Sequence, residues 1–222
     1  MASAFPGSPR VLRGALVVFE AAVPIPTNVI AFQFNPDSIS RTFAQQRGDT
    51  DPSVSAGDTM HVLPPTETLA LSAELDAVDQ LETEDPVAIA TGLHPTLAAL
   101  ELLLYPSSVD LILDKALALA GSARVKPGRV PIVLLVWGPL RVLPVRVESV
   151  SITEQAFDPR LNPIRATAEL RLRTLTEREL RAAGPPFDTL AFVNLIAKEV
   201  LARGAGVAAI ADVAGSASFS IL

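Results

Sequence analysis

The sequence predicts a mainly β protein, an antiparallel barrel or sandwich with a helical insertion at about 92–121 and a helical tail over 184–222. Short apolar runs with a two-residue period are separated by brief polar turns, which favours antiparallel pairing over alternating βαβ units. Helical periodicity interrupts these runs and returns after the last of them. At 222 residues and 49% hydrophobic, the chain is long enough to bury a substantial core. We therefore expect a flexible stretch at 1–10, a barrel domain at 11–183 and the tail.

The first two predicted strands lie on either side of a proline-containing interruption. Residues 13–20 (RGALVVFE) and 29–34 (VIAFQF) are short apolar runs bounded by turn residues. This pattern is typical of paired strands. The alternation in the second run is expected to place three aromatic or aliphatic side chains on one face: Ile30, Phe32 and Phe34.

A rigid turn is expected at Asn35-Pro36-Asp37. Pro36 fixes its own φ and disfavours helical backbone at Asn35, and Asp37 can hydrogen-bond to nearby backbone groups. A third strand follows, with three side chains on a common face: Ile39, Arg41 and Phe43. Residues 45–67 then show no period and contain several Gly and Pro residues, which predicts a long loop or an extended arm.

The middle of the chain combines one clear strand with the helical insertion. Residues 67–75 (ETLALSAEL) alternate, which predicts a strand with Leu and Ala inward. After an acidic segment at 76–91, two helices are expected, at 94–106 with Thr96 as its cap and at 108–120. The first should bury one leucine stripe, made of Leu97, Leu100 and Leu104, with Leu103 as a candidate fourth member.

Three further runs predict the remaining strands. Residues 130–137 are continuously apolar, which favours a strand buried on both faces. The alternation over 145–152 changes phase and indicates a bulge near Ser149. Residues 164–175 alternate cleanly, so that a slip by one residue would bury charges. Their inward side chains are expected to be Ala166, Ala168, Leu170 and Leu172.

Helical signals return after the last strand. The capping-box spacing of Thr176 and Glu179 predicts a short helix to Arg181, and Asp188 is expected to cap another helix over 188–203. The apolar face of that helix consists of Phe192, Leu195, Ile196 and Val200. The Ala/Gly-rich residues that follow favour a terminus that is weakly ordered or orders on a partner, and we expect no membrane insertion.

Composition and motifs argue against several functional classes. The net charge of −6 and the absence of a basic stripe argue against nucleic-acid binding. The chain has no Cys, and His61 and His94 lack companions at metal-ligand spacing, so we expect no metal site and no cofactor. Asp110, Asp114 and His61 are the only candidates for acid–base chemistry, and the i, i+4 spacing of the two aspartates is typical of a solvated helix face. No catalytic residue is predicted, and residues 1–10 lack the apolar core of a signal peptide.

Five short motifs occur in a fixed order along the chain. They are FQFNP at 32–36, LD at 75–76, WG at 137–138, TEQAF at 153–157 and NPIRA at 162–166. In this order and at these separations they resemble the tube-domain baseplate proteins of contractile injection systems. The resemblance extends over about Val11 to Arg173. Many members of that family carry a C-terminal LysM module, whereas only helical patterns follow here, so peptidoglycan contact is not expected.

The resemblance implies a structural subunit, not an enzyme. It implies a β-barrel of the phage-tail-tube type, a homo-hexameric ring that joins the inner tube to the baseplate, and partners among the inner tube, tube-initiator, baseplate and spike proteins. Assembly would take place in the cytoplasm, in a particle that is either retained or released. Which layer of the tube or baseplate the subunit forms stays open.

A ring subunit must present sheet edges and extended arms to its neighbours. The turn after residue 34, the arm and the tail helix are therefore the candidate subunit interfaces. Their residues are Asn35, Pro36, Asp37, Arg47, Asp49, Phe192, Leu195 and Ile196. The alternative is a soluble ligand-binding β-sandwich in which residues 45–67 hold a small molecule.

Overall fold

The computed structural model describes residues 12–20, 25–45, 64–119, 130–185 and 187–217. The chain divides into two compact units, Met1–Thr176 and Glu177–Leu222. Among the described residues, the first contains the β-sheet, four α-helices and one 3-10 helix, and the second contains two α-helices and one 3-10 helix.

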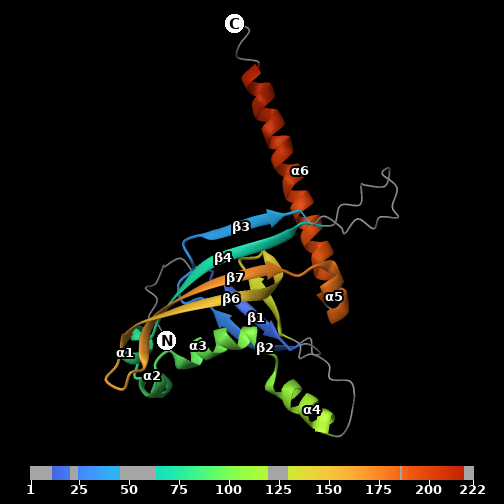
Figure 1. The fold of residues 1–222 in the computed structure, drawn as a ribbon. Coiled ribbons are helices and arrows are strands. Elements are labelled where there is room, and N and C mark those ends of the chain that lie inside the picture. The colour runs from blue at the N-terminus through green and yellow to red at the C-terminus, as the bar shows by residue number, and fades with distance from the viewer. Residues whose placement is uncertain (1–11, 21–24, 46–63, 120–129, 186, 218–222) are drawn as a thin grey trace. The chain divides into compact units, whose positions relative to one another are not determined.

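Seven antiparallel strands of the described residues form a single sheet, in the order β2-β1-β5-β6-β7-β4-β3 (Figure 1). The strands are β1 (Ala15–Phe19), β2 (Pro26–Ala31), β3 (Ile39–Ala44), β4 (Thr66–Asp76), β5 (Ile132–Val136), β6 (Val142–Phe157) and β7 (Pro163–Thr174). The predicted antiparallel β architecture is confirmed, and each expected strand is present. Within the described residues the sheet does not close into a barrel, because β2 and β3 are its end strands and do not pair with each other.

One face of the sheet carries the hydrophobic core. β4 and β7 alternate as predicted, with buried side chains at every second position. Leu16 of β1, Ile30 of β2 and Leu71 of β4 belong to the same core cluster. Strands near opposite ends of the sheet therefore contribute to one core, which requires the sheet to curl around it.

The predicted bulge is present in β6. Val147 pairs with Leu172 and Ser149 pairs with Arg171, so the register shifts between these two pairs. One extra residue, Glu148, sits in β6 at this point and bends the strand. The phase change in the sequence therefore reported a real irregularity of the sheet.

The prediction that Ile30, Phe32 and Phe34 share one face of the second strand is partly wrong. Phe32 is buried as expected, but Phe34 is 50% exposed. The reason is that β2 ends at Ala31, so that Phe34 lies in the connection to β3 and no longer follows the strand period.

Two short helices within the acidic segment were not predicted, α1 (Val78–Glu82) and α2 (Pro86–Thr91). Asp85 caps α2, because its Oδ1 accepts hydrogen bonds from Val87 N at 2.8 Å and Ala88 N at 3.3 Å. Pro86 at the first helical position supports this start.

The helical insertion is present as α3 (His94–Glu101), the 3-10 helix η1 (Leu102–Leu104) and α4 (Ser108–Leu119). Thr96 does not cap α3, whose N-cap is Leu93. Leu103 is buried and Leu104 is 37% exposed, since the 3-10 turn has three residues per turn and continues the stripe at Leu103. Leu97 and Leu100 belong to the same core cluster as Leu103. Figure 1 shows α3 lying along the sheet.

The second unit consists of α5 (Glu177–Ala183), η2 (Phe187–Thr189) and α6 (Leu190–Ala217). Asp188 lies inside η2, and α6 runs beyond the expected end at residue 203. Among the helices that the structure describes, none combines the length and hydropathy that a membrane crossing requires.

Candidate assembly site

Asn35 ties the turn after β2 to the segment that precedes β1. Its Oδ1 accepts a hydrogen bond from Gly14 N at 2.8 Å, and its Nδ2 donates one to Leu12 O at 2.8 Å. Phe32 N donates to Gly14 O at 2.9 Å. The Asn35 carboxamide therefore bonds to the segment before β1 as the backbone of a neighbouring strand would, because it supplies a donor and an acceptor together.

An aromatic cluster lies beside this turn. The rings of Phe32 and Trp137 meet edge to face, with centroids 6.1 Å apart. A Cβ added to Gly14 would lie 2.6 Å from Trp137 Cε3 and 2.9 Å from Phe32 Cδ2. Trp137 N donates to Arg141 O at 2.7 Å, and Gly138 has a φ of +76°. The β5–β6 turn that contains Trp137 and Gly138 thus places the Trp137 ring directly against Gly14. A side chain at position 14 would collide with this ring, so the position requires glycine.

Asp76 joins the end of β4 to the same turn and to β7. Its backbone N–H donates to Gln33 Oε1 at 2.9 Å, and its Oδ2 accepts from Arg165 Nε at 3.0 Å and Nη2 at 2.7 Å. Burial raises the pKa of Asp76, but the Val78 N–H and the Arg165 guanidinium lower it by more, so the pKa lies below its usual value. Asp76 is therefore ionised at neutral pH.

Asn162 and Pro163 fasten the helices to the start of β7. Pro163 O accepts a hydrogen bond from Leu93 N at 2.9 Å, and Asn162 Nδ2 donates to Ala90 O at 3.3 Å. Gly92 has a φ of +55°, and a Cβ there would lie 2.4 Å from Pro163 O. The close approach of the two backbones at this point requires glycine.

The turn between β6 and β7 is organised by Asp158. Its Oδ1 accepts from Arg160 N at 2.7 Å and Asn162 N at 2.8 Å, and its Oδ2 accepts from Asn162 Nδ2 at 2.9 Å. The Asn162 carboxamide and backbone N–H groups hold the pKa of Asp158 below its usual value. Leu161 adopts a φ of +66° and is 77% exposed.

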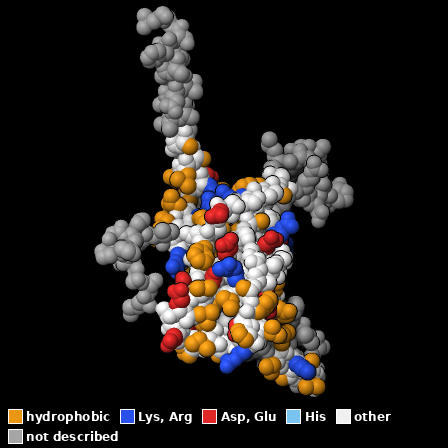
Figure 2. Space-filling view, turned by 90° about the vertical axis from the view of Figure 1, so that its left-hand side faces the viewer, with side chains coloured by type: hydrophobic (Ala, Val, Ile, Leu, Met, Phe, Trp, Pro, Cys, Tyr) orange, Lys and Arg blue, Asp and Glu red, His pale blue; other side chains and the backbone are white. Residues whose placement is uncertain are grey.

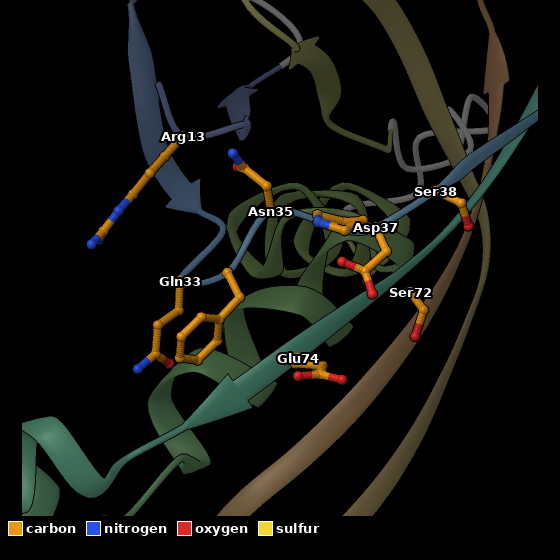
Figure 3. Close-up of a pocket in the computed structure, with 9 residues that line it drawn as sticks. Arg13, Gln33, Asn35, Asp37, Ser38, Ser72 and Glu74 are labelled. Atoms are coloured by element: carbon orange, nitrogen blue, oxygen red, sulfur yellow. The ribbon is translucent and has the colours of Figure 1, made fainter. Parts of the chain in front are cut away.

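A hollow of about 710 Å³ lies beside the Asn35 turn. Its wall is the segment from Gln33 to Ser38 together with Arg13, Ser72 and Glu74. Figure 3 shows Asp37 and Glu74 on one side of the hollow and Arg13 on the other. Neither the Asp37 nor the Glu74 carboxylate has a hydrogen-bond or ion-pair partner among the residues that the structure describes.

The two end strands are the other exposed feature of the first unit. Five of the six residues of β2 and five of the six of β3 are exposed. Each strand pairs on one side only within the described part of the chain. Unpaired edge N–H and C=O groups are templates for pairing with another chain.

An ion pair anchors β3 to β4 on the inner side of that edge. Arg41 Nη2 lies 2.6 Å from Glu67 Oε1, and Glu67 is only 3% exposed. The Arg41 guanidinium also lies 5.0 Å from the centroid of the Phe43 ring. The predicted common face of Arg41 and Phe43 is therefore present.

The family model of contractile injection system tube proteins matches residues 20–183, which is 164 of the 222 residues. The chain belongs to the contractile injection system tube protein family. The resemblance drawn from the five motifs is thus confirmed. This family is a family of structural tube proteins.

Two solved structures with similarity to this tube protein come from gene transfer agent particles. One is the tail of an empty particle, computed with helical refinement and C6 symmetry, with 11% sequence identity and a TM-score of 0.29. The aligned region covers 72% of this chain and 90% of the particle's chain. The other is the virion of a native particle, with 10% identity, a TM-score of 0.26 and the same coverage. No curated protein matches the chain.

Several motif residues of this tube protein lie where strand ends contact other strands or helices. Phe32 and Asn35 hold the β2–β3 connection, Asp76 and Arg165 join β4 to β7, and Asn162 holds α2. In this chain these motif residues therefore fix how the strand ends meet.

The predicted interface residues fall into three groups. Asn35, Pro36 and Asp37 line the hollow, although the Asn35 carboxamide is already engaged within the chain. Arg47 and Asp49 lie outside the described residues. The three predicted interface residues of α6 are all exposed: Phe192, Leu195 and Ile196.

The histidines and aspartates considered for chemistry belong to different segments of the chain. His94 is the first residue of α3, His61 lies outside the described residues, and Asp110 and Asp114 belong to α4. Where the chain is described, no three His, Cys, Asp or Glu side chains are grouped as metal ligands would be.

Sequence reasoning missed Gly14, Gly92 and the Asp158–Leu161 turn. The turn has a local signal, because Asp158 and Pro159 favour a tight reversal. The two glycines have none, since their neighbours Trp137 and Pro163 are far away in the sequence.

Proposed function

We propose that the chain is a structural adaptor of the inner tube or baseplate in a contractile, phage-tail-like injection particle. Six copies close into a ring that connects the tube to the baseplate. The observation that carries the proposal is the open, curled sheet with two exposed end strands, β2 and β3, in a member of the tube family.

The physical argument is that the end strands leave backbone groups unpaired in one copy. Pairing such edges between copies satisfies those groups and buries the exposed apolar side chains along them. On β2 this applies to Val29, and on β3 to Phe43. A ring has no free ends, so closure satisfies every edge.

The Asn35 turn serves this proposal through its rigidity. Because Asn35 and Gln33 bind both to the segment before β1 and to the end of β4, the connection between the two end strands is fixed before copies meet. A contact surface that is already ordered loses less conformational entropy on assembly.

The tail is assigned to partner binding. The barrel-like domain at 11–183 forms the ring, and the tail at 184–222 docks on a neighbouring baseplate subunit through the exposed apolar side chains of α6. The partners are the inner tube, tube-initiator, baseplate and spike proteins of the same particle, which assembles in the cytoplasm. No catalytic residue is assigned.

The test is co-purification and particle assembly. The tagged chain, expressed with candidate tube, sheath and baseplate proteins of the same particle, should co-purify with tube and baseplate subunits. A strain without the chain should produce no complete particles in negative-stain electron micrographs. Normal particles in that strain, together with failure to co-purify, would contradict the adaptor role and favour the ligand-binding β-sandwich.

A further inference from the structure

We propose that the β6–β7 tip (residues 158–162) of one copy seats in the hollow beside the Asn35 turn of a neighbouring copy. We name this hollow, whose wall is the Gln33–Ser38 segment with Arg13, Ser72 and Glu74, the Asn35 hollow. The inference rests on the proposed function, because it needs copies of the chain held side by side.

The tip is rigid and presents an apolar side chain to solvent. Three hydrogen bonds from Arg160 N, Asn162 N and Asn162 Nδ2 converge on the Asp158 carboxylate. Two backbone hydrogen bonds close the same turn, Asp158 N to Asn162 O at 3.0 Å and Leu161 N to Asp158 O at 2.9 Å. A fixed turn that exposes Leu161 is organised for contact before binding.

The backbone of the tip is strained at that leucine. Leu161 has a φ of +66° and Ala156, just before the tip, has a φ of +48°. Residues other than glycine rarely adopt this conformation, and it persists where the surrounding hydrogen bonds impose it. The hydrogen bonds of the turn therefore hold Leu161 in this conformation, and its side chain is 77% exposed.

Charge makes the tip and the hollow complementary. The Asp158 carboxylate is occupied within the turn, whereas the exposed Arg160 forms no ion pair with any described residue. The hollow holds two carboxylates, Asp37 and Glu74, against the single cation of Arg13. An arginine that enters such a site forms charge-assisted hydrogen bonds with carboxylates.

The hollow also offers apolar surface for Leu161. Phe34 belongs to its wall and is half-exposed in the single copy. The end of the molecule that carries the tip adds an apolar rim, since α2 exposes Val87 and Ile89 and is bonded to the tip through Asn162. Figure 2 looks onto this end and shows hydrophobic patches between single acidic and basic side chains.

The contact is of the head-to-tail kind. The tip and the Asn35 hollow are different parts of the surface, so each copy uses its tip on one neighbour and its hollow on the other. Contacts of this kind close into rings when the rotation between copies is suitable. The occupant of the hollow is therefore a second copy of this chain.

Because the chain contains no cysteine, disulfide trapping tests the contact directly. Two singly substituted chains, Leu161→Cys and Ser38→Cys, carry tags of different size, are co-expressed and are oxidised mildly. The expected product on a non-reducing gel is the mixed dimer, in at least about fivefold excess over either homodimer. As control, Leu140→Cys replaces Leu161→Cys, since Leu140 is also exposed and lies at the opposite end of β6.

The outcomes separate the contact from the ring. If wild-type rings form and Leu161→Cys gives no more mixed dimer than Leu140→Cys, the contact is overturned and the ring stands. A disulfide from Ser38→Cys to a different particle protein would also overturn it. If the wild-type chain forms no rings, the proposed function itself has failed.

Charge reversal provides a second readout. Arg160→Glu and Glu74→Arg should each raise the concentration for half-maximal ring formation by about tenfold or more. The double variant Arg160→Glu/Glu74→Arg should recover most of that loss. Arg178→Glu, an equal charge change at an exposed residue of α5, should leave assembly unchanged. Additive losses in the double variant would contradict a contact between these two residues.

Discussion

Arg165 of β7 lies directly opposite Asp76 of β4, and its Nη2 is 2.7 Å from Asp76 Oδ2. This pair connects the start of β7 to the end of β4, where Asp76 N–H also holds Gln33 of the turn after β2. Three segments that are distant in the sequence thus meet at one ion pair.

Asp76→Asn should lower the free energy of unfolding by about 1 kcal/mol at pH 7, since the pair is largely exposed on the arginine side. The pKa of Asp76 in the folded chain lies below the ordinary value of 3.8, so the unfolded state binds protons first as pH falls. The stabilisation is therefore full above about pH 5 and is lost as pH falls through the folded pKa.

Urea unfolding of the wild type and Asp76→Asn between pH 7 and pH 3 measures this difference. The gap between the two proteins should shrink toward acid pH. Asp79→Asn on α1 is the control, since Asp79 makes no ion pair with Arg165. A gap that widens toward pH 3 would rule out the ionised pair as its source.

Gly14→Ala should destabilise the first unit by about 1–3 kcal/mol, because its methyl group would enter the space of the Trp137 and Phe32 rings. Thermal unfolding with tryptophan fluorescence reports on the site directly, since Trp137 is the only Trp. Gly204→Ala is the matched control. Apart from its chain neighbours and the nearby backbone of its own helix, no described atom lies within 4 Å of the added methyl group, so this change in α6 should stabilise by up to about 1 kcal/mol.

Asn35→Ala should destabilise by about 1–2 kcal/mol, since it removes both hydrogen bonds to the segment before β1. Asn35→Asp keeps the acceptor for Gly14 N and loses the donor to Leu12 O. Its midpoint in urea should therefore lie between those of the wild type and Asn35→Ala. An Asn35→Asp protein less stable than Asn35→Ala would show that the amide pairing is not what matters.

Glu67→Ala should lower the free energy of unfolding by about 3 kcal/mol, because it leaves Arg41 without its buried partner. The double variant Arg41→Leu/Glu67→Leu should lose less than the sum of the two single leucine substitutions. A double-mutant cycle in urea measures the coupling, and strictly additive losses would argue against it.

Val29→Lys should weaken ring formation without changing the stability of the single copy. Val29 is exposed on the end strand β2, and a lysine on an edge opposes pairing with another chain. Leu140→Lys, at an exposed residue of the β5–β6 turn, is the control. Equal weakening by both changes, measured by light scattering, would count against edge pairing.

The strands could be predicted because one-sided burial imposes a two-residue period on the sequence. β4 follows it from Glu67 to Leu75 and β7 from Ala166 to Leu172, and the bulge at Val147–Ser149 left a phase change. The helices α1 and α2 left no such record. With five and six residues they are too short to show a helical period. Asp85 lies among other acidic residues, so its role as the N-cap of α2 did not stand out in the sequence.

The candidate site was predictable only in its local part. Asn35 and Pro36 predict a turn from the sequence alone, because proline restricts the backbone of both residues. The hollow, in contrast, needs Arg13, Ser72 and Glu74, which the curl of the sheet brings to that turn from three distant segments. Leu161 carried no signal, because its exposure follows from the hydrogen bonds of Asp158.

The distribution of oligomer masses of the purified wild-type chain tests ring formation most directly. Mass photometry over a hundredfold range of concentration should show a species of six times the monomer mass, whose share grows with concentration. Negative-stain images of that species should show closed six-fold rings. A single monomer peak at every concentration, with no binding to tube or baseplate proteins, would contradict the account.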